Sequence, residues 1–292
     1  MKPVLSPKEF AKAIGVSESS LKRWADEGAI RYSRTAGGHR RILIADALRF
    51  VRETHTPIIR PEILGLPDLS AVNQDPDAAE PDEVRLFRYL ESGRAAEARG
   101  LIVSWYLAGA NVASIIDGPV RLAMQRMGTL WHESPEGICI EHAALDLCIQ
   151  ALNQLRLLLP ANEDGPLAVG GAPAGDPYII PSLAVATVLA ESGYQAVNLG
   201  PDTPANAFQA ALRRYNPPLV WLTTSYVRDP AQLSRDITAL AGQLSERNAT
   251  LIIGGSAGSL IDLPSLPNLH RRDSMKDLAE IAERLRTSSA SS

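Results

Sequence analysis

The spacing of hydrophobic residues changes twice along the 292-residue chain. Up to about residue 53, short amphipathic segments alternate with glycines and polar turns. From Asp82 to Leu159, apolar residues recur at the spacing of an α-helix. From Pro166 onward, short apolar runs alternate with helical segments. These patterns predict a small helical head, a helical middle region and a C-terminal α/β domain.

The head opens with two short helices whose ends are marked in the sequence. Ser6 and Glu9 form a capping box for the first helix, and Gly15 ends it. Ser17 caps the second helix, which ends at Gly28. Two short helices around a glycine-containing turn predict a helix-turn-helix.

A hairpin over 31–42, with Gly37 and Gly38 at its tip, follows the two helices, and a third helix is expected from about Ala45 to Arg52. A recognition helix followed by a basic wing can reach the major groove and the flanking phosphates of DNA. The predicted DNA-binding residues are Ser19, Ser20, Lys22 and Arg23 on the second helix and Arg34, Thr35, His39, Arg40 and Arg41 on the wing. The pattern, including the run GGHRR, resembles the winged helix-turn-helix of the MerR family over about the first 53 residues.

The charge distribution supports a nucleic-acid partner for the head alone. Residues 1–53 hold eleven Lys and Arg against six Asp and Glu, a net charge of +5, whereas the whole chain carries −4. The remainder therefore carries −9, and only the head is expected to meet a polyanion.

Residues 54–81 are rich in Pro and Asp, show no sustained period and are expected to form a linker. A four-helix bundle is predicted over 82–160 from four helical segments joined by short connections. The segments are 82–92, 94–107, 111–131 and 136–159.

The α/β domain is expected over 165–287, followed by a disordered tail at 288–292. Its predicted strands are 166–171, 194–200, 219–225 and 250–255, with a fifth near Leu269, and its predicted helices are 182–192, 204–215, 230–247 and 274–286. This alternation predicts a doubly wound five-stranded parallel sheet of flavodoxin-like type. Ligands of such sheets bind at the carboxyl ends of the strands, so 171–181 and 200–204 are expected to line a site.

The bundle and sheet carry further family signatures. Trp131 is followed after nine residues by Glu141 and His142, and the sheet domain contains LGPDTP at 199–204, Thr224-Ser225 and Gly254-Gly255. With the head, this order resembles the light-sensing CarH and LitR regulators of the MerR family, which carry a cobalamin-binding domain. The resemblance implies that Trp131, Glu141 and His142 line the upper face of a cobalamin pocket. The alternative is a core tryptophan and a surface Glu-His pair.

The sequence differs from that family at the position of the histidine that coordinates cobalt in family members. The family has Asp/Glu-x-His-x-x-Gly after the first strand, whereas this chain has Asp176, Tyr178 and Pro181 at the corresponding positions, and no His between His142 and His270. A phenol with a pKa near 10 is a poor substitute for a neutral imidazole. The candidate ligand-binding residues are Trp131, Glu141, His142, Asp176, Tyr178, Ser182, Gly200, Thr203, Ser225, Gly254 and Gly255.

Three interpretations of the sensory region stay open. It binds cobalamin without protein coordination, it binds another tetrapyrrole in the same cleft, or it is an oligomerisation module without a ligand. For a haem, His132 and His142 are the nearby imidazoles. Cys139 and Cys148 are interpreted as buried apolar residues, and no metal site is predicted from them.

The favoured function is a cytoplasmic, dimeric or tetrameric transcriptional regulator that binds operator DNA, without enzymatic activity and without a membrane partner. No apolar run approaches the roughly 20 residues that span a bilayer. Two rivals are a corrinoid-dependent methyltransferase or mutase subunit and a scaffolding protein that acts only through protein contacts.

Overall fold

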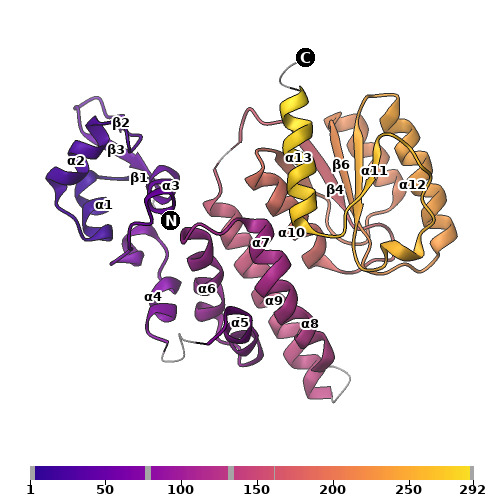
Figure 1. Cartoon of the computed structure of the whole chain (residues 1–292), viewed down its shortest axis with the longest axis horizontal. Coiled ribbons are helices and arrows are strands. Elements are labelled where there is room, and N and C mark those ends of the chain that lie inside the picture. Colours follow the sequence, from indigo (N-terminus) through magenta and orange to yellow (C-terminus); the bar gives the residue numbers. More distant parts are fainter. Residues whose placement is uncertain (1–3, 76–79, 131–134, 161, 290–292) are drawn as a thin grey trace. The chain divides into compact units, whose positions relative to one another are not determined.

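The computed structural model describes residues 4–75, 80–130, 135–160 and 162–289, which fall into two compact units. Unit 1 comprises 1–111 and 118–159, and unit 2 comprises 112–117 and 160–292 (Figure 1). The head and the bundle lie in unit 1, and the α/β domain lies in unit 2. No helix in the described part of the chain is long and apolar enough to cross a membrane.

The head has the winged helix-turn-helix arrangement that its pattern predicts. Its elements are β1 (Val4–Leu5), α1 (Pro7–Ile14), α2 (Glu18–Asp26), β2 (Ser33–Arg34), β3 (Arg40–Leu43) and α3 (Ile44–Thr54). Both hydrogen bonds of the Ser6–Glu9 capping box are present at the start of α1. The antiparallel sheet has the order β1-β3-β2, so the wing is a three-stranded sheet that includes a strand preceding α1.

The segment expected to be a linker is folded over part of its length. It contains η1 (Pro61–Leu64) and α4 (Asp68–Asn73). Helix α4 lies so close to the following bundle that a Cβ at Gly100 would come within 2.3 Å of the Asp68 carbonyl oxygen. The Arg99 guanidinium also pairs with the Asp68 carboxylate at 2.9 Å. The connection therefore packs on the bundle, which the Pro- and Asp-rich composition alone did not indicate.

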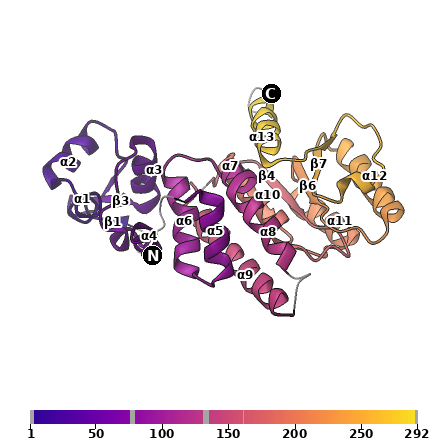
Figure 2. The same cartoon turned by 60° about the horizontal axis from the view of Figure 1, so that its bottom comes forward.

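Four helices make up the bundle: α5 (Asp82–Glu91), α6 (Ala95–Leu107), α8 (Arg121–Leu130) and α9 (Pro135–Leu158) (Figure 2). The single helix expected over 111–131 is wrong. It is divided into α7 (Val112–Ile115), the π-type turn η2 (Ile116–Val120) and α8, because Gly118 has non-helical angles and Pro119 follows it. Helix α7 packs with unit 2.

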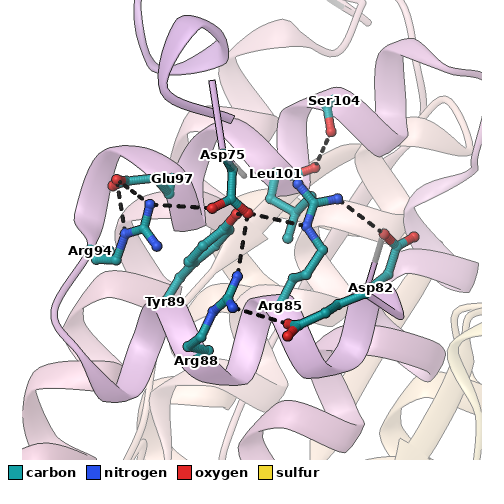
Figure 3. A network of polar contacts seen from close by, with 10 residues as sticks. Asp75, Asp82, Arg85, Arg88, Tyr89, Arg94, Glu97, Leu101 and Ser104 are labelled. Carbon is teal, nitrogen blue, oxygen red and sulfur yellow. Dashed lines mark hydrogen bonds and ion pairs between the residues drawn. The ribbon is translucent and has the colours of Figure 1, made fainter. Parts of the chain in front are cut away.

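A buried carboxylate joins the connection to the bundle. Asp75 accepts a hydrogen bond from the Tyr89 hydroxyl and faces the guanidiniums of Arg85, Arg88 and Arg94 at 3.7, 3.4 and 3.6 Å (Figure 3). Burial by itself raises the pKa of Asp75, but the Tyr89 hydrogen bond and the nearby arginines outweigh it and hold this pKa below its usual value. Asp75 is therefore a charged anchor between the connection and α5.

The α/β domain has a parallel sheet in the order β5-β4-β6-β7-β8, the flavodoxin-like order. Its strands are β4 (Leu167–Gly171), β5 (Gln195–Asn198), β6 (Leu219–Thr223), β7 (Thr250–Gly254) and β8 (Leu269–Arg271). Helices α10 (Ile179–Glu191) and α13 (Met275–Ser289) pack together, and α11 (Ala205–Tyr215) and α12 (Pro230–Ser245) cover the opposite face (Figure 1). A short 3-10 helix, η3 (Gly258–Leu260), lies between β7 and β8.

Two further expectations are wrong. Cys148 is buried, which raises the pKa of its thiol to about 12, but Cys139 is exposed. The two cysteines are two and a half helical turns apart, so they lie on opposite faces of α9. Helix α13 continues to Ser289, beyond the predicted start of the disordered tail at 288.

Candidate nucleic-acid interface and ligand cleft

The start of α2 is fixed by a serine cluster. The Ser17 hydroxyl caps the helix by accepting from the Ser20 amide at 3.0 Å, and the hydroxyls of Ser19 and Ser20 each lie 2.8 Å from it. Ser19 is exposed and Ser20 is half-buried. Of the two hydroxyls, that of Ser19 is therefore the better placed for an external partner.

Further along α2, Lys22 and Arg23 are exposed. Lys22 pairs with Glu18 at 2.7 Å, and Arg23 lies 3.9 Å from Glu27. Both pairs join residues four positions apart on the solvent side of the helix. Exposed pairs of this kind are weak, so both cations can exchange their partner for a phosphate.

Arg40 joins the wing to α2. Its guanidinium pairs with the Asp26 carboxylate, donates to the Lys22 carbonyl at 3.3 Å and lies 4.9 Å from the centre of the Tyr32 ring. Its side chain is only 17% exposed. Arg40 therefore positions the wing against the recognition helix, while its neighbour Arg41 is exposed.

The wing tip is a closed turn. The Thr35 amide donates to the His39 carbonyl at 2.9 Å, and the Thr35 hydroxyl accepts from the His39 amide at 3.2 Å. Gly38 has a φ of 80°, which favours glycine at this place. Thr35, His39 and Arg34 are all exposed, so the tip presents donors to solvent on a short, ordered hairpin.

At the carboxyl edge of the parallel sheet, Asp176 ties two loops together. Its side chain accepts from the amides of Ser225 at 2.6 Å, Tyr226 at 3.1 Å and Tyr178 at 3.1 Å, and the residue is fully buried. The Asp176 carbonyl also accepts from the Asp202 amide at 2.8 Å. The carboxylate predicted to face a ligand is thus committed to the backbone of the β4–α10 and β6–α12 loops.

Ser182 is equally committed. Its hydroxyl donates to Asn198 at 2.6 Å and accepts from the Trp221 indole at 3.3 Å. Trp221 is 1% exposed, and a Cβ at Gly170 would lie 2.2 Å from its ring. The indole therefore fills the space between β4, β6 and α10.

The glycines and the threonine of the predicted cleft also have structural partners. Gly200 has a φ of 88°, and a Cβ at Gly254 or Gly255 would meet the Arg272 or Thr224 carbonyl oxygen at 2.6 or 2.4 Å. The amide of Thr203, a buried residue, donates to the Ala172 carbonyl at 2.9 Å. The fold itself therefore accounts for the three glycines, and it uses the backbone amide of Thr203, with or without a ligand.

Cobalamin held by an imidazole does not fit this sheet edge. Tyr178 stands at the N-cap position of α10 with 49% of its surface exposed, and the loop carries no histidine. Among the described residues, no group of three or more His, Cys, Asp or Glu is placed to hold a metal ion. The polar side chains of Asp176 and Ser182 are already engaged by protein groups.

The predicted upper-face residues belong to unit 1. Glu141 is half-buried and His142 is exposed on α9, whereas Trp131 and His132 lie outside the described residues. Their place on the upper face of a pocket beside the sheet stays a prediction.

Sequence reasoning missed three residues that organise these surfaces. Asp26 and Tyr32 hold Arg40, and Trp221 fills the sheet face. The only sequence signal for Trp221 was a large aromatic residue within a short apolar run, and this does not show which face of the sheet it covers.

The sequence pattern of the MerR family regulatory protein matches residues 6–42. The chain is 28% identical over 232 residues to the HTH-type transcriptional repressor CarA of Myxococcus xanthus, a match that covers 77% of this chain and 78% of the relative. Among solved structures it is similar to the monomethylamine corrinoid protein of Methanosarcina barkeri, with 18% identity, a TM-score of 0.48 and coverage of 68% of this chain and 96% of that one. It is also similar to a cobalamin-binding protein of Desulfitobacterium hafniense, with 17% identity, a TM-score of 0.35 and coverage of 70% and 99%.

Proposed function

We propose that this MerR-type DNA-binding regulator with a cobalamin-binding-like C-terminal domain binds operator DNA as a homo-oligomer and does not use imidazole-coordinated cobalamin. The matched family is a regulatory protein family and the curated relative is a transcriptional repressor, and both support a regulator rather than an enzyme. The residue assignments, the oligomer and the response to a ligand are the parts that need a test.

The attachment of the wing to α2 carries the DNA-binding assignment. Arg40, held by Asp26 and the Lys22 carbonyl, keeps the wing against the recognition helix. The exposed donors on both elements then serve as one surface, with the helix in the major groove and the wing on flanking phosphates. The proposed contacts are Ser19, Ser20, Lys22 and Arg23 from α2 and Arg34, Thr35, His39 and Arg41 from the wing, with Arg40 as a positioning residue.

Two heads on successive major grooves would read a palindrome or repeat, which requires a dimer or a tetramer. We assign the bundle and the sheet domain to this assembly and place the protein in the cytoplasm, together with its DNA. The boundaries 1–53, 82–160 and 165–287 serve as working limits of the three domains.

For the sensory domain, the commitment of Asp176 and Ser182 to protein groups favours a ligand other than His-coordinated corrinoid. A tetrapyrrole without protein coordination, with Glu141 and His142 of α9 as candidate contacts, is the alternative. A purely oligomerising domain is the third interpretation. An absorption spectrum and size-exclusion profile before and after adenosylcobalamin addition distinguish these possibilities.

Titration of the DNA upstream of the protein's own reading frame, at several salt concentrations, tests the DNA assignment. Arg41→Ala should lower the salt-dependence slope by about one unit, because one phosphate contact is lost. Arg213→Ala, which removes an exposed arginine of α11, is the matched control and should leave the slope unchanged. A wild-type protein that fails to shift this DNA at physiological salt would instead support the scaffolding interpretation.

A further inference from the structure

A pocket of about 310 Å³ opens at the carboxyl edge of the sheet, on the face that α11 and α12 cover. Its floor is apolar and includes Phe208 of α11, Leu222 of β6 and Ile237 of α12, which are all buried. Its floor lies on the sheet face opposite α10 and Trp221, and part of its rim, residues 173–175 and Thr203, belongs to the two loops that were predicted to border the ligand cleft. Its volume lies at the lower end of the range for small-molecule sites, roughly 300–1,000 Å³.

The polar groups of the pocket are few and mainly acidic. Asp229 and Asp236 line it from the start and the second turn of α12, together with the amide side chain of Gln232. The Asp229 carboxylate caps α12 by accepting from the backbone amide of Gln232 at 2.9 Å. The Asp236 carboxylate accepts from the side-chain amide of Gln232, also at 2.9 Å. Among the residues that the structure describes, Arg228 is the only basic one that lines the pocket. Two carboxylates and one guanidinium favour a ligand with a cationic group or a strong hydrogen-bond donor.

The walls of this pocket are held in place without a ligand. Asp176 fixes the β6–α12 loop immediately before Val227 and Arg228 by accepting from the Ser225 and Tyr226 amides. On the other side, the Thr203 amide bonds to Ala172, next to Pro173. A site whose walls are already ordered avoids part of the entropy cost of binding.

We propose that this pocket binds a small apolar molecule with one cationic or hydrogen-bond-donating group, which places its apolar part on Phe208, Leu222 and Ile237 and its head group near Asp229 and Asp236. This proposal names a ligand class for the proposed sensory domain. It rests on the proposed function only where it expects the ligand to change DNA binding. Ligand binding itself is a property of the α/β domain and can be measured without DNA.

Three probes of matched shape test the proposal by isothermal titration calorimetry on the full-length protein: 4-phenylbutylamine, 4-phenylbutanol and 4-phenylbutyrate. The amine should bind more tightly than the carboxylate by about tenfold, because a charge-assisted hydrogen bond is replaced by repulsion. Equal affinity for the amine and the carboxylate, or no heat of binding with any of the three, would overturn the proposal.

Two variants locate the binding. Ala239→Phe places a ring at a lining position on the exposed side of α12 and should reduce amine affinity at least about tenfold, whereas Ala231→Phe, on the same helix but not in the lining, should not. Asp236→Asn should remove the preference for the amine, and Glu246→Gln, at the end of α12, should retain it. Unchanged binding in both Ala239→Phe and Asp236→Asn would show that the probes bind elsewhere and would refute the site.

A DNA titration with and without the amine keeps the two proposals distinguishable. If amine binding is weakened by Ala239→Phe and loses its preference in Asp236→Asn, but the protein does not bind operator DNA, the pocket is supported and the DNA assignment is contradicted. If the protein binds operator DNA but the pocket variants leave amine binding unchanged, the DNA assignment is supported and the pocket proposal is contradicted.

Discussion

The guanidinium of Arg40, on the wing, forms an ion pair with the carboxylate of Asp26, near the end of the recognition helix. The two residues are fourteen positions apart and belong to the two elements that are assigned to DNA. Because the Arg40 side chain is mostly buried and that of Asp26 is 56% exposed, the pair is a positional link with little effect on stability.

Replacing Asp26 with Asn should therefore weaken operator binding more than it weakens folding. We expect a loss of several-fold in affinity with an unchanged salt slope, since Asp26 contacts no phosphate, and a stability change below about 1 kcal/mol. Fluorescence anisotropy with labelled operator measures the first effect, and urea unfolding measures the second. Glu27→Gln, which alters a pair within α2 only, is the control; an equal loss in that variant would contradict a role for the Arg40 link.

Asp176 should be essential to the stability of the α/β domain. Asp176→Ala removes the acceptor of three part-buried backbone hydrogen bonds and is expected to cost about 3 kcal/mol. Asp202→Ala removes one acceptor, for the Gly175 amide, and should cost about 1 kcal/mol. Amide hydrogen exchange in 167–230 measures both losses, and equal protection in the two variants would contradict the anchoring role.

The Asp75 cluster predicts a specific pH dependence. The folded protein holds the pKa of Asp75 below its unfolded value, near 3.9, so this stabilisation is fully present above that pH and is lost as the pH falls through the folded value. Asp75→Asn should cost roughly 2 kcal/mol at neutral pH, and its difference from wild type should shrink below about pH 4.

Hydrogen exchange of α5 across that pH range measures this effect. Asp82→Asn is the control, because Asp82 pairs with the same Arg85 at 3.8 Å from a half-exposed position. A constant difference between Asp75→Asn and wild type at all pH values would show that Asp75 contributes packing and not charge.

Adenosylcobalamin, added in the dark, should not co-migrate with this protein as an imidazole-coordinated complex. The β4–α10 loop offers Tyr178 and no histidine, and Trp221 fills the adjoining sheet face. Absorption spectra across a size-exclusion peak provide the measurement, with Tyr178→His as the comparison. A wild-type complex that survives gel filtration with the same absorption spectrum as the Tyr178→His complex would refute this prediction, whereas a complex with a different spectrum would favour binding without protein coordination.

Local signals allowed much of the fold to be predicted from sequence. The Ser6–Glu9 capping box is confirmed because both partners lie within one helical turn, and the five strands follow from short apolar runs. The cleft was harder to predict, because two of the amides that Asp176 binds, those of Ser225 and Tyr226, lie 49 and 50 residues away. The sequence alone does not show which strand ends meet across the sheet. The break at Gly118 had a visible cause, since a proline follows it, yet the helical period continued through it.

The position of α7 limits which domains of such a protein can be exchanged by gene fusion. The chain crosses between the units at 111/112, 117/118 and 159/160, so the segment 112–117 belongs to unit 2 although its neighbours in sequence belong to unit 1. Within unit 2, the Val112 amide donates to the Glu191 carboxylate, and the Asp117 carboxylate accepts from the first amides of α13. A gene fusion that moved only the codons for 160–292 would leave part of this domain behind. Bundle and sheet should therefore be exchanged between proteins as one cassette, while the head, which lies before all three crossings, can be exchanged without them.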